Sequence, residues 1–140
     1  MLESHRVQQI IINLISNAIK FSKEKSNIYV DVQIRKDVKK GVQQCSISVL
    51  DEGIGIHPSE QPNIFQPFFS TASQCSRKMN PNGNGLGLSI CKSIAKAING
   101  DITFTSQVGL GTCFTFTMTM QSVEKSAAKE AANKTDDLQK

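Results

Sequence analysis

The sequence lacks any run of apolar residues long enough to cross a membrane. The residues that follow Met1 are charged and polar from the start, so we also expect no secretory signal peptide. These two absences predict a cytoplasmic chain that makes no direct contact with a membrane. They leave open that a longer parent protein is anchored in one.

Positive charge is present but not concentrated. The formal net charge is +4, and the lysines are scattered, with many of them in the C-terminal tail. There is no basic stripe with interleaved aromatic residues, which is the pattern typical of a nucleic-acid-binding surface. We therefore expect no nucleic-acid partner.

The cysteines are far apart and are not arranged for metal binding. They form no C-x-x-C pair, and no histidine lies near them at zinc-finger spacing. Neither a metal cluster nor a disulfide framework is indicated, so we expect reduced thiols. Cys45, Cys91 and Cys113 have apolar neighbours and are expected in the core, whereas Cys75 lies in a polar loop.

The first part of the chain predicts a helix followed by a hairpin. Residues 3–22 repeat apolar residues at three- and four-residue steps, which is typical of an amphipathic helix. Residues 28–35 and 45–50 alternate apolar and polar residues on either side of a charged turn at residues 36–41. This alternation predicts a hairpin with one buried face.

The second part of the chain predicts two more helices and a second hairpin. Residues 58–65 are expected to form a short helix, and residues 66–84 to form a long polar loop. Residues 86–98 return to helical spacing, and residues 101–106 and 112–120 alternate like paired strands.

This order of elements predicts an α+β fold. We expect a two-layer α/β sandwich in which helices cover one face of a mixed, mostly antiparallel sheet. With 39% apolar residues in a chain of 140, one domain can build an ordinary core, and we assign it to residues 1–121. Residues 122–140 lack an apolar stripe and are expected to form a polar tail, disordered or a frayed helix.

Two glycine-rich segments have positions suited to a nucleotide. Residues 51–55 (D-E-G-I-G) follow an apolar strand, and residues 83–87 (G-N-G-L-G) come just before a helix. Glycine allows positive φ and close approach of a ligand, and a helix N-terminus attracts phosphate. Either segment alone could be a plain turn. Two of them in a short chain indicate a nucleotide pocket.

Three polar residues of the first predicted helix project from one narrow face. Asn13, Asn17 and Lys20 are spaced four and three residues apart, beside the apolar stripe. One interpretation is a bland surface group. In the functional interpretation, the side-chain oxygen of Asn17 binds Mg²⁺, which prefers hard oxygen ligands, and the positive charge of Lys20 faces phosphate.

An acidic residue marks the end of the strand before the first glycine segment. Asp51 could simply start a turn, as aspartate often does. On a pocket wall, its carboxylate could instead accept the exocyclic amine of adenine. Guanine has a carbonyl oxygen at that place, and two acceptors repel each other, so such a contact would select adenine.

Five segments now stand in one order along the chain. They are residues 13–21 (N-L-I-S-N-A-I-K-F), 51–55, 64–69 (I-F-Q-P-F-F), 83–88 (G-N-G-L-G-L) and 109–112 (G-L-G-T). The set resembles the catalytic and ATP-binding domain of sensor histidine kinases, in the superfamily of gyrase B, the Hsp90 chaperones and the MutL proteins. The resemblance covers residues 3–120 and implies the Bergerat-type ATP-binding fold.

The resemblance implies a role for each matching position. Asn17 corresponds to the Mg²⁺ ligand, Lys20 to a phosphate-contacting lysine and Asp51 to the adenine-binding carboxylate. In the ATP lid, Arg77 or Lys78 corresponds to a basic residue that reaches the γ-phosphate. The positions implied to bind ATP and Mg²⁺ are Asn17, Lys20, Asp51, Gly53, Gly55, Ile56, Phe65, Arg77, Lys78, Gly83, Gly85, Leu86, Gly87, Leu88 and Thr112, with Gly109 and Gly111 near the adenine.

The implied catalytic residues are Asn13, Asn17 and Lys20. Asn13 matches the position that holds a general-base glutamate elsewhere in the superfamily, and an amide cannot take a proton from water. This difference favours a kinase over an ATPase that activates water. An ATPase of the gyrase type and an ATP-gated protein-binding switch remain the alternatives.

The resemblance also implies partners. The acceptor histidine of such a kinase lies on a dimerisation hairpin, and neither His5 nor His57 has the sequence context of an acceptor. We therefore expect that hairpin in another chain or in a longer parent, and a response-regulator receiver domain downstream. Phe65, Phe68 and Phe69 could anchor the base of the lid in the core or dock on the dimerisation helices.

Overall fold

The computed structural model describes residues 2–37, 40–69 and 83–121. The expected tail at residues 122–140 and most of the expected loop at residues 66–84, including Cys75, lie outside these residues. The elements in chain order are α1 (Leu2–Phe21), β1 (Ile28–Asp37), β2 (Val42–Asp51), the 3₁₀-helix η1 (Gln61–Asn63), α3 (Gly87–Ala97), β3 (Gly100–Gln107) and β4 (Gly111–Gln121). The two long helices and both hairpins match the prediction from sequence.

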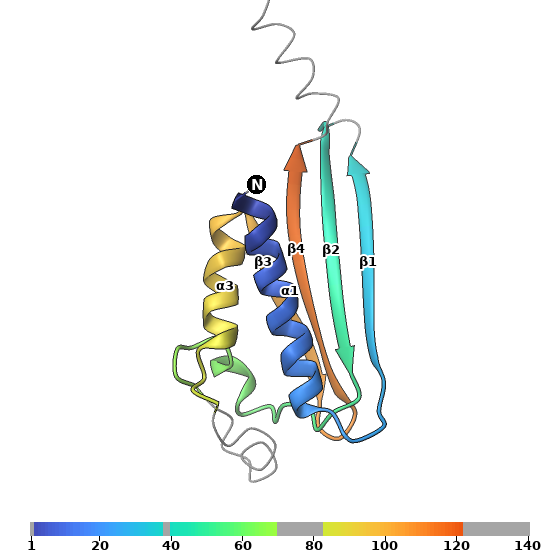
Figure 1. Ribbon diagram of the computed structural model, residues 1–140, viewed down its shortest axis with the longest axis vertical. Coiled ribbons are helices and arrows are strands. Elements are labelled where there is room, and N and C mark those ends of the chain that lie inside the picture. The colour runs from blue at the N-terminus through green and yellow to red at the C-terminus, as the bar shows by residue number, and fades with distance from the viewer. Residues whose placement is uncertain (1, 38–39, 70–82, 122–140) are drawn as a thin grey trace, which may run out of the picture.

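The four strands form one sheet in the order β1-β2-β4-β3. All three pairings are antiparallel. Strand β4 lies between β2 and β3, and its pairing with β2 joins the two hairpins into one sheet. Helices α1 and α3 pack side by side against one face of this sheet (Figure 1). The fold is therefore the two-layer α/β sandwich that the sequence predicts.

The core lies between the two helices and the centre of the sheet. Its largest fully buried side chains are Phe116, Ile10, Leu14, Ile102, Val49 and Cys91. Burial raises the pKa of the Cys91 thiol to about 11, so this cysteine is a protonated, unreactive core residue. Cys45 is buried as predicted, whereas Cys113 is only half-buried.

The short helix predicted for residues 58–65 is reduced to the single 3₁₀ turn η1. Most backbone hydrogen bonds in this segment span three residues, such as the bond from the N–H of Asn63 to the carbonyl of Glu60 at 3.0 Å and the bond from the N–H of Gln66 to the carbonyl of Asn63 at 2.9 Å. A single bond, from the N–H of Gln61 to the carbonyl of His57 at 3.2 Å, spans four. Pro62 stands in the first turn and has no N–H to donate. The segment is therefore a chain of tight turns, and the prediction of a regular helix was wrong.

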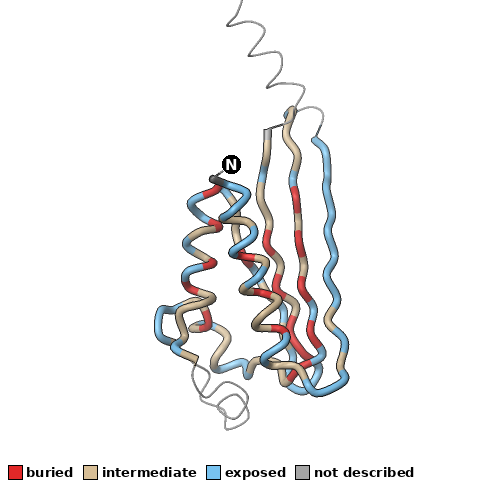
Figure 2. The backbone as a smooth tube through the Cα atoms, viewed as in Figure 1, coloured by how far each residue is buried: buried red, intermediate tan, exposed pale blue. Residues whose placement is uncertain are grey.

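The first hairpin lacks the continuous buried face that its alternation predicts. On β2, Ile47 and Val49 are buried, but their register partners on β1, Val32 and Val30, are 57% and 50% exposed. The reason is that β1 is the edge strand and α1 packs over β2 and β4 instead (Figure 1). Figure 2 shows β1 exposed along most of its length.

A matched pair of substitutions tests this difference between neighbouring strands. Val49→Ala should lower the free energy of unfolding by about 2 kcal/mol, because it removes two buried methyl groups and leaves a cavity. Val30→Ala, directly across the strand pair, should cost less than about 1 kcal/mol. Urea unfolding of both variants measures the costs. Equal losses would contradict the exposed position of β1.

Candidate functional site

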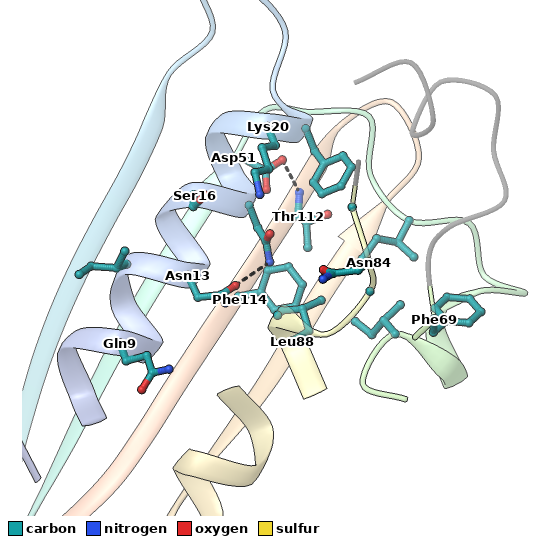
Figure 3. Close-up of a pocket in the computed structure, with 18 of the residues that line it drawn as sticks. Gln9, Asn13, Ser16, Lys20, Asp51, Phe69, Asn84, Leu88, Thr112 and Phe114 are labelled. Atoms are coloured by element: carbon teal, nitrogen blue, oxygen red, sulfur yellow. Dashed lines mark hydrogen bonds between the residues drawn. The ribbon is translucent and has the colours of Figure 1, made fainter. Parts of the chain in front are cut away.

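One cavity of about 660 Å³ opens beside α1 at the end of the sheet. Its walls come from five parts of the chain: one face of α1, the end of β2 with the turn that follows it, Ile64 and Phe69 near η1, the start of β4, and residues 83–88 at the start of α3. Figure 3 shows side chains from these elements converging on the same space. Segments far apart in the sequence thus meet at one site.

Helix α1 contributes two different faces. Ile10, Leu14 and Ala18 point into the core, and the polar residues beside them line the cavity. Asn17 donates a hydrogen bond from its amide nitrogen to the side-chain oxygen of Asn13, 3.3 Å away. This bond, which runs along the helix from one turn to the next, uses the amide N–H of Asn17 and leaves its oxygen for another ligand.

Asp51 is a buried carboxylate, only 4% exposed, on the cavity wall at the end of β2. One of its oxygens accepts hydrogen bonds from the backbone N–H groups of Gly53, at 2.9 Å, and Thr112, at 3.2 Å. Burial raises the pKa of the Asp51 carboxyl above its ordinary value, and these two N–H groups oppose that rise. Among the described residues, its second oxygen has no hydrogen bond and remains for a ligand.

The turn after Asp51 fits only because it contains glycine. A Cβ at Gly53 would lie 2.2 Å from the carbonyl oxygen of Phe21, and Gly55 has φ +69°. The N–H of Ile54 donates to that same carbonyl at 3.2 Å, and the N–H of Gly109 donates to Ile54 at 2.8 Å. These contacts join the end of α1, the turn and the second hairpin around the base of the cavity.

The second glycine segment brings a helix start to the other end of the cavity. Gly85 has φ +66°, and a Cβ there would lie 2.4 Å from the carbonyl oxygen of Phe69. A Cβ on Gly87 would meet the side chain of Asn13 at 3.0 Å. Helix α3 begins at Gly87 with no side-chain cap and no acidic residue in its first turn. Its first N–H groups can therefore bind an anion.

The family follows from comparison with known proteins. A family model described as histidine kinase-, DNA gyrase B-, and HSP90-like ATPase matches residues 3–122. The chain belongs to this family.

Relatives within the family are sensor histidine kinases. The chain is 40% identical over 110 residues to the sensor histidine kinase RcsC of Escherichia coli K12. This alignment covers 79% of this chain and 11% of RcsC. It is 34% identical over 130 residues to the sensor histidine kinase WalK of Bacillus subtilis, covering 93% of this chain and 20% of WalK. The chain thus spans only a small part of the curated relatives that it matches.

Solved structures of histidine kinases share the fold. The mycobacterial sensor histidine kinase MprB aligns with a TM-score of 0.67 at 22% identity, over 86% of this chain and 74% of that one. Full-length ShkA, solved in complex with AMPPNP, aligns with a TM-score of 0.57 at 26% identity, over 81% of this chain and 21% of ShkA. The α+β sandwich is therefore the fold of histidine kinase catalytic domains.

Most of the residues that the family resemblance assigned to nucleotide binding line this one cavity. They are Asn13, Asn17, Lys20, Asp51, Gly55, Ile56, Gly83, Gly85, Gly87, Leu88 and Thr112. Gly53 lies behind the wall against Phe21, and Leu86 precedes α3 as its N-cap residue. Arg77 and Lys78 lie outside the described residues. Their contact with phosphate stays a prediction.

The phenylalanines of residues 64–69 have separate environments. Phe65, which the resemblance implied to bind ATP, is not among the residues that line the cavity. Its ring lies in the core layer, where it makes edge contacts with Phe104 at 5.8 Å and with Phe114 at 6.5 Å. Phe69 lines the cavity, whereas Phe68 is 75% exposed and has φ +61°. The sequence offered two roles for these phenylalanines, an anchor in the core and a surface that docks on the dimerisation helices. The packing of Phe65 in the core layer suits the first role, and the exposure of Phe68 suits the second.

Several lining residues were not predicted from the sequence. On α1 they are His5, Gln8, Gln9, Ile12, Ser16 and Phe21, and elsewhere they are Ile54, Ile64, Phe69, Asn84 and Phe114. The helical period could have found Gln9 and Ser16, since they share a face with Asn13 and Lys20 (Figure 3). Phe114 gives no such signal, because its position depends on the pairing of β4 with β2.

The buried charge predicts how stability depends on pH. Because the pKa of Asp51 is raised in the folded state, its contribution to stability is greatest below its ordinary pKa and is lost as pH rises through the folded pKa. Asp51→Asn keeps an oxygen that can accept from Gly53 and Thr112. In the absence of nucleotide it should therefore melt higher than wild type near pH 7, by a few degrees, and this gap should shrink toward pH 4.

Thermal melts of the two proteins between pH 4 and 7.5 check this sign. Glu52→Gln, which changes the exposed carboxyl group next in the chain, is the control. If Asp51→Asn melts lower than wild type at every pH, the buried carboxylate stabilises the empty protein, and its pKa is not raised by folding.

Proposed function

We propose that this chain is the ATP-binding catalytic domain of a sensor histidine kinase. It would transfer the γ-phosphoryl group of ATP to a histidine on a dimerisation hairpin in another chain or in a longer parent protein. One observation carries the proposal: a buried carboxylate, an uncapped helix N-terminus and the polar face of α1 all line one cavity.

The base of ATP would bind at Asp51. The second oxygen of this carboxylate can accept the exocyclic amine of adenine, while its first oxygen is held by Gly53 and Thr112. The glycine turn at residues 53–55 leaves room for the purine to approach the backbone. The 6-carbonyl oxygen of guanine would face the same acceptor and be repelled.

The triphosphate would lie along α1 toward the start of α3. Asn17 can offer its side-chain oxygen to Mg²⁺, and Lys20, also on the cavity wall, supplies a positive charge for phosphate. The first N–H groups of α3 are free to bind phosphate oxygens. Bound Mg²⁺ would neutralise phosphate charge. In the described part of the chain, no group of three or more His, Cys, Asp or Glu residues could hold a metal ion, so the phosphates would supply ligands together with Asn17.

The charge of the cavity wall favours transfer to a protein over hydrolysis. Asp51 is the only carboxylate among the described residues that line the cavity, and in this proposal it faces the adenine. The phosphate end has Asn13, whose amide cannot take a proton from water. A kinase needs chiefly to position ATP and balance its charge, so that an acceptor nitrogen can form a bond to the γ-phosphorus while ADP leaves with the electron pair.

The acceptor hairpin and a downstream receiver domain belong to this proposal as partners. The printed names of the relatives support the class of protein, and the structure of ShkA with AMPPNP supports an ATP analogue as the ligand of the fold. Exposed Phe68, beside the cavity residue Phe69, offers an apolar contact for the dimerisation helices. No helix among the described residues is long and apolar enough to span a membrane.

The metal ligand can be tested by one substitution on α1. Asn17→Ala should weaken Mg·ATP binding about tenfold or more, because it removes an oxygen ligand, while the helix keeps its stability since alanine favours helix. The measurement is the shift in melting temperature with ATP, with and without chelator, since binding stabilises the folded state. Asn27→Ala, an exposed asparagine outside the cavity, is the matched control. An unchanged metal dependence in Asn17→Ala would exclude Asn17 as the ligand.

Phosphoryl transfer needs a second polypeptide in this proposal. The chain alone, incubated with radiolabelled ATP, should gain no acid-labile phosphate on His5 or His57. Addition of a separately expressed dimerisation hairpin should produce phosphohistidine on the hairpin, and Asn17→Ala should abolish it. ATP-dependent binding of the hairpin without transfer would instead identify a protein-binding switch. Steady phosphate release by the chain alone would identify an ATPase.

A further inference from the structure

Ser106, at the end of β3, is the centre of a small hydrogen-bond network behind the adenine end of the cavity. Its hydroxyl oxygen lies 2.8 Å from the backbone nitrogen of Ile56, 3.1 Å from the carbonyl oxygen of Gly111 and 2.8 Å from the hydroxyl oxygen of Thr112. Thr112 lines the cavity and is 5% exposed, whereas Ser106 is not part of the wall. Any effect of Ser106 on a ligand must therefore act through its neighbours.

The chemistry of the three neighbours fixes the direction of each bond. A hydroxyl has one proton to donate and two lone pairs that accept. The N–H of Ile56 can only donate to Ser106, and the carbonyl of Gly111 can only accept from it. The single proton of Ser106 therefore goes to Gly111, and the remaining lone pair accepts the proton of the Thr112 hydroxyl.

This assignment satisfies all three contacts, and the reverse does not. If Ser106 donated to Thr112, the contact to the carbonyl of Gly111 would have no proton. The end of β3 is also held from another side, because the side chain of Gln61 donates to the carbonyls of Ile56 at 3.1 Å and Ser106 at 3.4 Å. The network is thus anchored at several points and resists reorientation.

We propose that Ser106 is a positioning residue that holds the Thr112 hydroxyl as an acceptor and so sharpens the choice of adenine over guanine. With its proton given to Ser106, Thr112 offers only lone pairs to the cavity. Asp51 beside it is also an acceptor, so both polar groups at this end suit an amine and repel a carbonyl oxygen. The inference rests on the proposed function, since it assumes that the purine of ATP binds here.

Removal of the Ser106 hydroxyl should weaken selectivity more than it weakens ATP binding. In Ser106→Ala the Thr112 hydroxyl is free to turn and donate to the 6-carbonyl oxygen of guanine. The ratio of the dissociation constants for Mg·GTP and Mg·ATP, measured by calorimetry, should fall about fivefold, the factor expected of one hydrogen bond. Ser106→Cys, which keeps the size of the side chain but hydrogen-bonds weakly, should lower the ratio in the same direction if the alanine variant folds poorly.

The sheet offers a matched control for this substitution. Ser48 and Thr115 form a second cross-strand hydroxyl pair, 2.9 Å apart, away from the cavity wall. Ser48→Ala removes the same kind of contact and should leave the ratio unchanged. Thr112→Val removes the hydroxyl that is proposed to contact the base. Adding Ser106→Ala to that variant should therefore change the ratio no further.

The outcomes separate this inference from the proposed function. If the wild-type protein binds neither nucleotide, the proposed function fails. If it binds both equally, the function stands, but the adenine contact at Asp51 and the inference about Ser106 are both overturned. If wild type prefers ATP and Ser106→Ala keeps the same ratio, even with both affinities reduced, Ser106 has a purely structural role and the inference is overturned. A further loss of selectivity when Ser106→Ala is added to Thr112→Val would also overturn it, because the effect would then bypass Thr112.

Discussion

The candidate site depends on one buried carboxylate. Asp51 ends β2, and the N–H groups that hold one of its oxygens come from the turn at Gly53 and from Thr112 on β4. Gly111, just before Thr112, packs so closely that a Cβ would lie 1.9 Å from the backbone oxygen of Asp51. Burial disfavours the charged form of this group. A domain that kept such a charge only for stability would gain little, which supports a role in binding.

Helix α1 connects this carboxylate to the rest of the site. Its apolar side builds the core with the sheet and α3, and its polar side forms the wall along which a triphosphate could lie. Because both functions belong to one rigid helix, the position of Asn17 and Lys20 relative to Asp51 is fixed by core packing. The glycine segments at residues 53–55 and 83–87 then bring backbone, rather than side chains, to the two ends of the cavity.

Sequence reasoning found what depends on local pattern and missed what depends on tertiary packing. The helical period identified α1 and its polar face, and the glycine segments identified both ends of the cavity. The same alternation appears in β1 and β2, yet only β2 is covered, because coverage depends on where α1 packs. Residues 58–65 looked helical in sequence, but the segment around Pro62 forms only the 3₁₀ turn η1. Ser106 carries no motif at all, and its contacts appear only once β3, β4 and the first glycine turn are assembled.

Binding of Mg·ATP in this cavity, with the adenine on Asp51, can be followed residue by residue. The decisive measurement is nuclear magnetic resonance of the backbone amides during a titration with Mg·ATP. We expect saturable shifts for Gly53, Thr112 and the first residues of α3, with little change along exposed β1. Absence of any shift at millimolar nucleotide, or shifts confined to residues outside the cavity, would show that Mg·ATP does not bind at this site.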